Sequence, residues 1–183
     1  MLYRLIFSVV WVALVTGCTS LPEDIEPVSE LDLKEYQGTW YEIARLDHSF
    51  ERGLTHVTAE YSINDDGSFT VINRGYSREE GSWQEAEGHA VPVEGGPAGH
   101  LKVSFFGPFY ASYVVFRLDD SYQTAYVTGY NREYLWLLSR TPEVSEETLA
   151  EFRAVAREKG FDLQELVIVD QGTKPVRRAD DPS

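Results

Sequence analysis

The chain has 183 residues, with 30 acidic and 16 basic side chains and a formal net charge of −14. This length is typical of a single domain. The acidic balance argues against nucleic acid as a partner and against electrostatic adhesion to anionic lipid, because phosphate groups are bound by clustered Lys and Arg.

Residues 1–17 are predicted to be a lipoprotein signal peptide. Arg4 supplies the positive charge at the N-terminal end of such a peptide, and Leu5–Val15 is mostly apolar but short for a membrane span. Leu14-Val-Thr-Gly-Cys18 resembles the lipobox of bacterial lipoproteins, which is cut before a cysteine that becomes acylated. A plain secretory peptide is the alternative. Acylation would account for Cys18, the only cysteine, being unpaired in an exported protein.

Cleavage would remove Arg4 and no acid, which takes the formal charge from −14 to −15. The membrane link is therefore expected to be the acyl chains, two or more of which give a stable anchor. Residues 18–30 form the acylated cysteine and a predicted extended tether that holds the domain off the surface, because they are rich in proline and acid. Residues 31–170 would be the folded domain and 171–183 a flexible tail.

Eight segments of alternating polarity, each followed by a short turn, make up most of the domain. This spacing predicts an all-β fold, an eight-stranded antiparallel up-and-down barrel wide enough for one small ligand. A single helix follows, with Ser145 as N-cap and Gly160 as C-cap. Its apolar stripe, which includes Phe152, is expected to pack on the outside of the barrel.

Strand alternation predicts which side chains face the interior. The predicted ligand-binding residues on strands are Ala59, Tyr61, Val71, Val103, Phe105, Tyr113, Tyr126 and Trp136. Few of them ionise, so the cavity suits an acyl chain, with Phe106 and Phe109 in the aromatic rim through which the chain would enter. The alternative is that these aromatics fill the barrel as core. Arg117 and Glu42 also face inward by alternation and are predicted to neutralise one another, since an unpaired buried charge is costly.

No motif for catalysis or metal binding stands out. The four histidines are scattered without metal-ligand spacing, and the chain contains neither a nucleophile motif nor a dinucleotide fingerprint. The sequence therefore predicts no catalytic residues, no metal site and no cofactor, and the protein is not expected to be an enzyme.

Three blocks carry a family resemblance. Gly38-Thr-Trp-Tyr-Glu-Ile-Ala44 resembles the opening strand of the lipocalins, and the blocks 101–110 and 134–142 are similar to bacterial lipocalins in particular. The resemblance implies a closed barrel end built from Gly38, Trp40, Tyr122 and Arg140, with the arginine packed across the tryptophan. Tyr122 is the secure residue of an otherwise degraded second lipocalin motif, Asp119-Asp-Ser-Tyr122.

The resemblance also implies a function. Bacterial lipocalins are outer-membrane lipoproteins that bind fatty acids or lysophospholipids and are associated with envelope stress. The expected partners are therefore such lipids and the membrane itself, reached through the N-terminal acyl chains, and a homodimer is possible. The alternatives are a lipocalin-fold enzyme acting on a bound lipophile and a structural envelope protein with a filled barrel.

Overall fold

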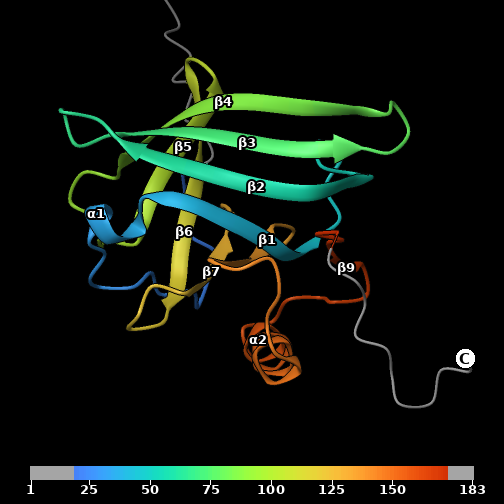
Figure 1. Cartoon of the computed structure of the whole chain (residues 1–183). Coiled ribbons are helices and arrows are strands. Elements are labelled where there is room, and N and C mark those ends of the chain that lie inside the picture. The colour runs from blue at the N-terminus through green and yellow to red at the C-terminus, as the bar shows by residue number, and fades with distance from the viewer. Residues whose placement is uncertain (1–18, 173–183) are drawn as a thin grey trace, which may run out of the picture.

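The computed structural model describes residues 19–172, so the predicted signal peptide, Cys18 and most of the predicted tail lie outside the described residues. The elements in chain order are α1 (Leu33–Tyr36), β1 (Gly38–Leu46), β2 (Leu54–Ile63), β3 (Phe69–Ser77), β4 (Ser82–Pro92), β5 (His100–Phe106), β6 (Phe109–Leu118), β7 (Thr124–Thr128), β8 (Leu135–Ser139), α2 (Glu146–Glu158) and β9 (Leu166–Ile168) (Figure 1).

The strands β1 to β8 form a closed antiparallel barrel. Neighbours in sequence pair with one another, and β1 closes the sheet by pairing with both β2 and β8. The predicted fold class is therefore confirmed. Since β2 pairs only with residues 38–41 of β1, β9 takes its place beside residues 44–46.

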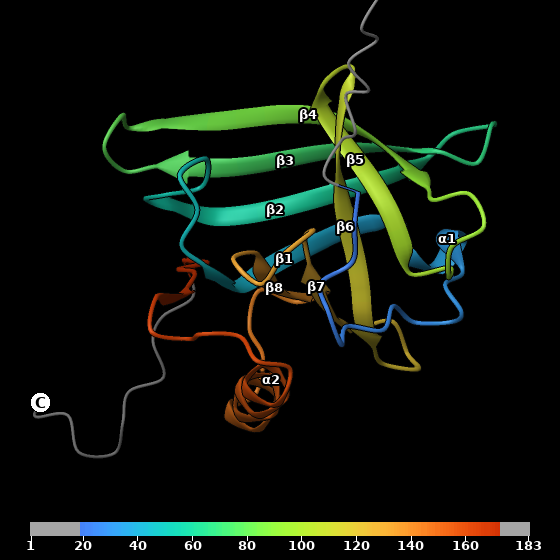
Figure 2. The ribbon, with the colours of Figure 1, turned by 180° about the vertical axis from the view of Figure 1, so that it is seen from behind.

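The up-and-down order gives the barrel two different ends. The turns 47–53, 78–81, 107–108 and 129–134 share one end, which we call the mouth. The other end, which we call the closed end, carries α1 and the start of β1. Views from both sides place α1 apart from α2, which lies against the outer wall near β7 and β8 (Figures 1 and 2).

Two hydrophobic cores follow from this arrangement. The inner core fills the closed half of the barrel around Trp40, Phe69 and Val115. The outer core lies between the barrel wall and α2, where Phe152 and Ala156 are fully covered. Ser145 caps α2, because its side chain accepts a hydrogen bond from Thr148 N.

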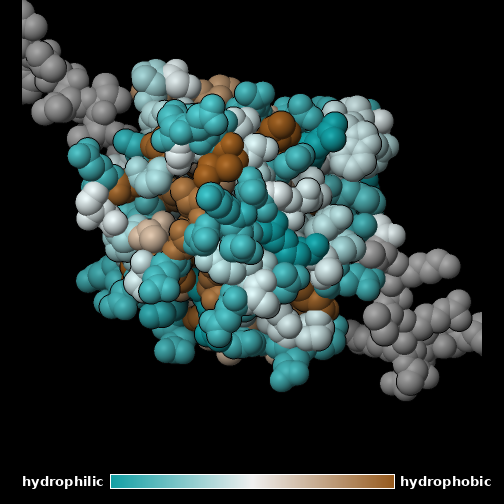
Figure 3. All heavy atoms as spheres, turned by 60° about the vertical axis from the view of Figure 1, so that its left-hand side comes forward, coloured by the Kyte–Doolittle hydropathy of each residue, from teal (hydrophilic) through white to brown (hydrophobic). Residues whose placement is uncertain are grey.

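The outer surface is mainly polar. On the face shown in Figure 3, the apolar side chains form separate patches between hydrophilic ones. In the part of the chain that the structure describes, no helix is long and apolar enough to cross a membrane.

Candidate ligand-binding site

The barrel interior collects most of the predicted ligand-binding residues. Seven of them belong to the inner core or pack against it: Ala59, Tyr61, Val71, Val103, Phe105, Tyr113 and Trp136. They come from β2, β3, β5, β6 and β8, so the wall that they form runs around most of the barrel.

Some of these inward side chains are not fully covered by protein. Ala59, Val103, Phe105 and Trp136 all keep accessible surface although they lie inside the barrel. Tyr113 does so as well, even though its hydroxyl is bonded to two buried tyrosines. Accessible surface at these inward positions indicates a hollow between the closed half and the mouth.

Three tyrosines form the bottom of the hollow. The hydroxyls of Tyr36 and Tyr113 are 2.7 Å apart, and the Tyr61 hydroxyl donates to that of Tyr113 at 2.9 Å. Burial raises the pKa of all three phenols well above its usual value, so they stay neutral. An apolar chain that reaches this depth meets ring faces and satisfied hydroxyls.

Below the tyrosines, Arg140 seals the closed end. Its guanidinium lies 3.9 Å from the Trp40 ring centre and donates to the carbonyl oxygens of Tyr122, Thr39 and α1. Gly38 begins β1 with a φ of +94°, and a Cβ there would lie 3.4 Å from the guanidinium. These contacts place all four predicted closed-end residues in one cluster, remote from the mouth.

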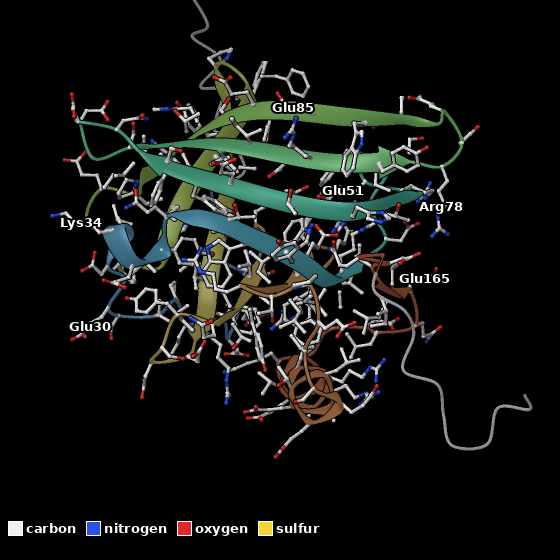
Figure 4. All side chains as sticks on the ribbon, viewed as in Figure 1. Glu30, Lys34, Glu51, Arg78, Glu85 and Glu165 are labelled. Carbon is white, nitrogen blue, oxygen red and sulfur yellow. The ribbon has the colours of Figure 1, made fainter. Side chains whose placement is uncertain are left out.

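A buried cluster of charged side chains lies above the tyrosines. Arg45 Nη1 donates to Glu42 Oε1 at 2.6 Å, and Arg45 Nη2 donates to the Glu51 carbonyl oxygen at 2.7 Å. Trp136 Nε1 donates to Glu51 Oε2 at 3.1 Å. The exposed fraction is only 1% for Arg45 and 7% for Glu51, which is labelled in Figure 4.

The cluster contains two carboxyl groups and one guanidinium, and the pKa of each carboxyl group is raised. Burial raises the pKa of Glu42 well above its ordinary value, the neighbouring Glu51 raises it further, and Arg45 opposes the rise. Burial likewise raises the pKa of Glu51. The Nε of Arg45 is buried and has no hydrogen-bond partner within the described chain. This N–H is therefore an unpaired donor among the described residues.

Sequence reasoning missed this cluster because β1 contains a bulge. Glu42 and Ala44 pair with the consecutive residues Leu138 and Leu137, which leaves Ile43 as an extra residue. Beyond it the alternation is inverted, so Arg45 points inward beside Glu42 instead of outward.

The prediction that Glu42 pairs with Arg117 was therefore wrong. Arg117 is about half exposed and forms an ion pair with Glu151 of α2, on the outside of the barrel. A second irregularity, between Val115 and Arg117, shifts the register of β6 against β7.

The placement of Tyr126 in the interior was also wrong. Tyr126 packs edge-on against Phe152 of α2, with ring centres 5.0 Å apart, and belongs to the outer core. Its neighbours Ala125 and Val127 face the interior instead. Tyr126 is thus part of the helix-docking surface.

Aromatic side chains surround the mouth. His48 lies between the rings of Phe50, Tyr134 and Trp136, at 4.9 to 5.3 Å between centres. Burial and the nearby Arg45 lower the pKa of His48 to about 4, so the imidazole is neutral near pH 7. Phe106 and Phe109, which flank the β5–β6 turn, are 82% and 60% exposed.

Both interior carboxyl groups are held by other side chains. The carboxyl groups of Glu42 and Glu51 are engaged with Arg45 and Trp136, and no serine or cysteine takes part in the cluster within the described residues. Residues 19–172 contain no group of three or more His, Cys, Asp or Glu side chains that could hold a metal ion.

A closed eight-stranded barrel with one sealed end and a largely apolar wall around a small charged cluster is an architecture that can hold a single small ligand. The family comparison agrees, since the model for the lipocalin-like domain matches residues 31–171. The chain belongs to the lipocalin family.

Bacterial lipoproteins are among its most similar relatives. The chain is 56% identical to "Outer membrane lipoprotein Blc" of Vibrio cholerae, over 92% of this chain and 99% of that one. It is 51% identical to the protein of the same name from Escherichia coli K12, over 86% and 90%. Temperature-induced lipocalin-1 of Arabidopsis thaliana is 31% identical over 84% and 86%.

Solved structures show the same fold. The cockroach allergen Per a 4 matches with a TM-score of 0.64 at 21% identity, over 83% of this chain and 95% of that one. Insecticyanin from Manduca sexta also matches with a TM-score of 0.64, at 20% identity over 82% and 86%.

Proposed function

We propose that the protein is a lipid-anchored lipocalin of the bacterial outer membrane that binds one single-chain amphiphile, a fatty acid or a lysophospholipid. The observation that carries the proposal is the partly open apolar hollow inside the barrel. The acyl tail lies in this hollow with its end toward the tyrosines, and the headgroup stays at the mouth. The names of the bacterial relatives support the membrane location.

The proposed ligand contacts are those that border the hollow: Ala59, Tyr61, Val71, Val103, Phe105, Tyr113 and Trp136. Phe106 and Phe109 contribute the rim at which the chain enters. Binding occurs without turnover, because the interior carboxyl groups have structural partners. Storage or transport of such lipids would serve envelope maintenance under stress.

Mass spectrometry of lipid extracted from protein purified from membranes tests the ligand class. We expect fatty acids or lysophospholipids in a ratio approaching one per chain. Ala59→Trp, which fills the hollow, is expected to reduce the amount recovered, while the exposed substitution Glu133→Gln leaves it unchanged. Absence of any lipophile, together with failure to bind an added fluorescent fatty acid, would favour a filled barrel.

The anchor is tested separately. Cys18 is the proposed attachment point, and the intact mass of the membrane-extracted protein should show an N-terminal cysteine that carries acyl chains. Cys18→Ala should give an unacylated protein that does not stay with the membrane. An unmodified cysteine in the mature protein would contradict the proposed anchor without affecting the proposed ligand.

A further inference from the structure

The barrel wall has a seam between β1 and β2, which the end of the described chain closes. β2 pairs only with residues 38–41 of β1, so the two strands separate beyond that point. Gln171 bridges them there, because its Nε2 donates to the carbonyl oxygens of Glu42 and Val57 at 2.7 and 2.9 Å. The C-terminal segment therefore satisfies backbone groups that the seam would leave unpaired.

This segment runs from β1 toward β2. Val169 N donates to the carbonyl oxygen of Ile43 in β1 at 3.0 Å, and His56 N in β2 donates to the carbonyl oxygen of Asp170 at 2.7 Å. Gly172 lies against β2, since a Cβ there would be 2.4 Å from His56 Nε2. A continuation in the same direction would cross β3 and then β4.

A groove lies on the outer wall in this direction. Its volume is about 410 Å³. It is bordered by side chains of β1 to β4 and of the C-terminal segment: Tyr41, His56, Thr58, Arg74, Trp83 and Gln171. Trp83 of β4 is 61% exposed, although an indole ring is among the side chains that gain most from burial. The groove therefore has an aromatic surface that the described residues leave uncovered.

The β3–β4 hairpin that carries Trp83 is acidic. Its exposed carboxylates precede and follow the ring: Glu79 and Glu80 in the turn, Glu85 and Glu87 on the outer face of β4. Its two cations are already engaged, Arg74 with Glu85 at 2.8 Å and Arg78 with Asp170, and Figure 4 labels Glu85 and Arg78. The other three glutamates form no ion pair among residues 19–172. Unbalanced negative charge thus lies on both sides of the exposed ring.

The residues that follow Gly172 have the complementary chemistry. Residues 173–178 read Thr-Lys-Pro-Val-Arg-Arg and lie outside the described residues. They carry three cations and no acid, with the apolar pair Pro175 and Val176 between the cations. Six extended residues span up to about 20 Å. Since β2 and β4 are two strand spacings apart, about 10 Å, a chain that leaves Gly172 beside β2 can reach Trp83.

We propose that residues 173–178 dock across this groove. We call these residues the C-terminal strap. Pro175 and Val176 cover the Trp83 ring, and the basic side chains lie beside the unpaired carboxylates of the β3–β4 hairpin, where a cation near the indole adds a cation–π contact. The inference depends neither on the proposed lipid ligand nor on the proposed anchor.

The strap has a consequence for the barrel wall. It follows directly on Gln171, which holds the Glu42 carbonyl oxygen, while the Glu42 side chain belongs to the buried cluster with Arg45. Docking on the outside therefore keeps the seam closed behind that cluster. Release of the strap should raise hydrogen exchange at the His56 amide, because this N–H depends on Asp170 for its partner.

The test uses the full mature protein in detergent and follows quenching of Trp83 fluorescence by acrylamide. Trp83→Phe, measured in each background, subtracts the signals of the other tryptophans. Because acrylamide is uncharged, charge substitutions and salt do not alter its approach to the ring.

We expect Trp83 to be shielded in the wild type. Lys174→Glu with Arg177→Glu and Arg178→Glu should raise its quenching constant several-fold, and high salt should have part of the same effect. Asp180→Asn with Asp181→Asn, the control within the same tail, should leave the shielding intact. Glu79→Lys with Glu87→Lys should also release the strap, and combining this pair with the three tail reversals should restore the shielding.

Nuclear Overhauser effects between the Val176 methyl groups and the Trp83 indole identify the occupant directly. Wild-type Trp83 that is quenched as freely as in the charge-reversed protein would show that the groove is uncovered, which overturns the inference. Shielding that grows with protein concentration would assign the groove to a second copy of the chain. Shielding that survives the tail reversals at every concentration would assign it to another bound molecule.

Discussion

Arg140 shows how one side chain can hold an end of the barrel. The ring face of Trp40 and several carbonyl oxygens replace the water that the guanidinium loses. Burial lowers the pKa of Arg140, but a guanidinium stays charged at any ordinary pH. The residue therefore serves stability at a distance from the proposed ligand.

We expect Arg140→Ala to lower the free energy of unfolding by about 1–3 kcal/mol, because it exposes the Trp40 ring and leaves carbonyl oxygens without a donor. Arg140→Lys should recover only part of this loss, since an ammonium cannot reproduce the planar fork. Denaturant unfolding measures the change, and lipid affinity should stay nearly constant. An unchanged unfolding midpoint with a collapsed affinity would instead assign Arg140 to the ligand.

His48 should make stability depend on pH. Its pKa is about 4 in the folded protein and near 6.5 in the unfolded chain, so between these values the unfolded chain binds more protons. The contribution of His48 is complete above pH 6.5 and is lost as the pH falls toward 4.

His48→Phe keeps the aromatic stack and removes this titration. The difference in unfolding free energy between wild type and variant should change by about 1.4 kcal/mol per pH unit, up to about 3 kcal/mol in total. Glu42 and Glu51 act in the opposite sense, because a raised folded pKa contributes stability at low pH that is lost as the pH rises. A parallel pH dependence in the two proteins would mean that His48 has the same pKa in the folded protein as in the unfolded chain.

The free energy of unfolding should depend on the balance of charges in the buried cluster. Arg45→Met should lower the free energy of unfolding by about 3–5 kcal/mol near pH 7, because it leaves two buried carboxyl groups without their cation. Adding Glu42→Gln should restore part of the loss. Chemical denaturation of the single and double variants measures both steps. Equal stability of Arg45→Met and wild type would show that the interior is wetter than the buried contacts indicate.

At the scale of elements, the alternating pattern predicted the strands and their order but failed locally where a strand contains an extra residue. Ile43 in β1 and the shift near Val115 in β6 each invert the parity beyond them. Arg117 was assigned to the wrong side for that reason, and Arg45 was not recognised as an interior residue. β7 itself alternates regularly, and Tyr126 was placed on the wrong one of its two faces. No local signal in the sequence marks either irregularity, since both depend on how neighbouring strands pair.

The correction to Tyr126 gives a prediction about α2. Phe152→Ala should lower the free energy of unfolding by about 3–5 kcal/mol, because the ring is fully buried against Tyr126 and the barrel wall. Lipid binding at a temperature where the variant is folded should be unaffected. Calorimetry and a fatty-acid titration measure the two properties. A matched loss of affinity would show that α2 shapes the hollow from outside.

At the scale of the whole molecule, the sequence predicted the closed end better than the mouth. The resemblance names the closed-end residues Trp40 and Arg140 although they lie far apart in the chain, whereas no motif marks the contact of the N-terminal segment with β6 or the hydrogen bond from Trp136 to Glu51. The composition of residues 19–30 is typical of a tether, yet Ile25 and Val28 are enough to hold it against the wall. Composition reports average behaviour and cannot show such individual contacts.

In the proposed site the tyrosines set the depth that a chain can reach, and ligand affinity should reveal that depth. Each buried methylene contributes roughly 0.8 kcal/mol, so affinity should rise about fourfold per added carbon. The rise should stop when the chain end reaches Tyr61 and Tyr113. Some fifteen methylenes could supply about 12 kcal/mol, of which half or more offsets the lost motion of the ligand. This leaves about 6 kcal/mol or less, an affinity of roughly 40 micromolar or weaker.

Titration of saturated fatty acids and lysophospholipids of increasing length, followed by Trp136 fluorescence, measures this dependence. We expect chain length to matter more than headgroup charge, and salt to change the affinity little, because the proposed headgroup position at the mouth stays in contact with water. Ala59→Trp should shift the plateau to shorter chains, whereas Glu133→Gln at the mouth should leave it in place. An affinity that ignores chain length, or that falls steeply with salt, would place the ligand at a charged surface outside the barrel.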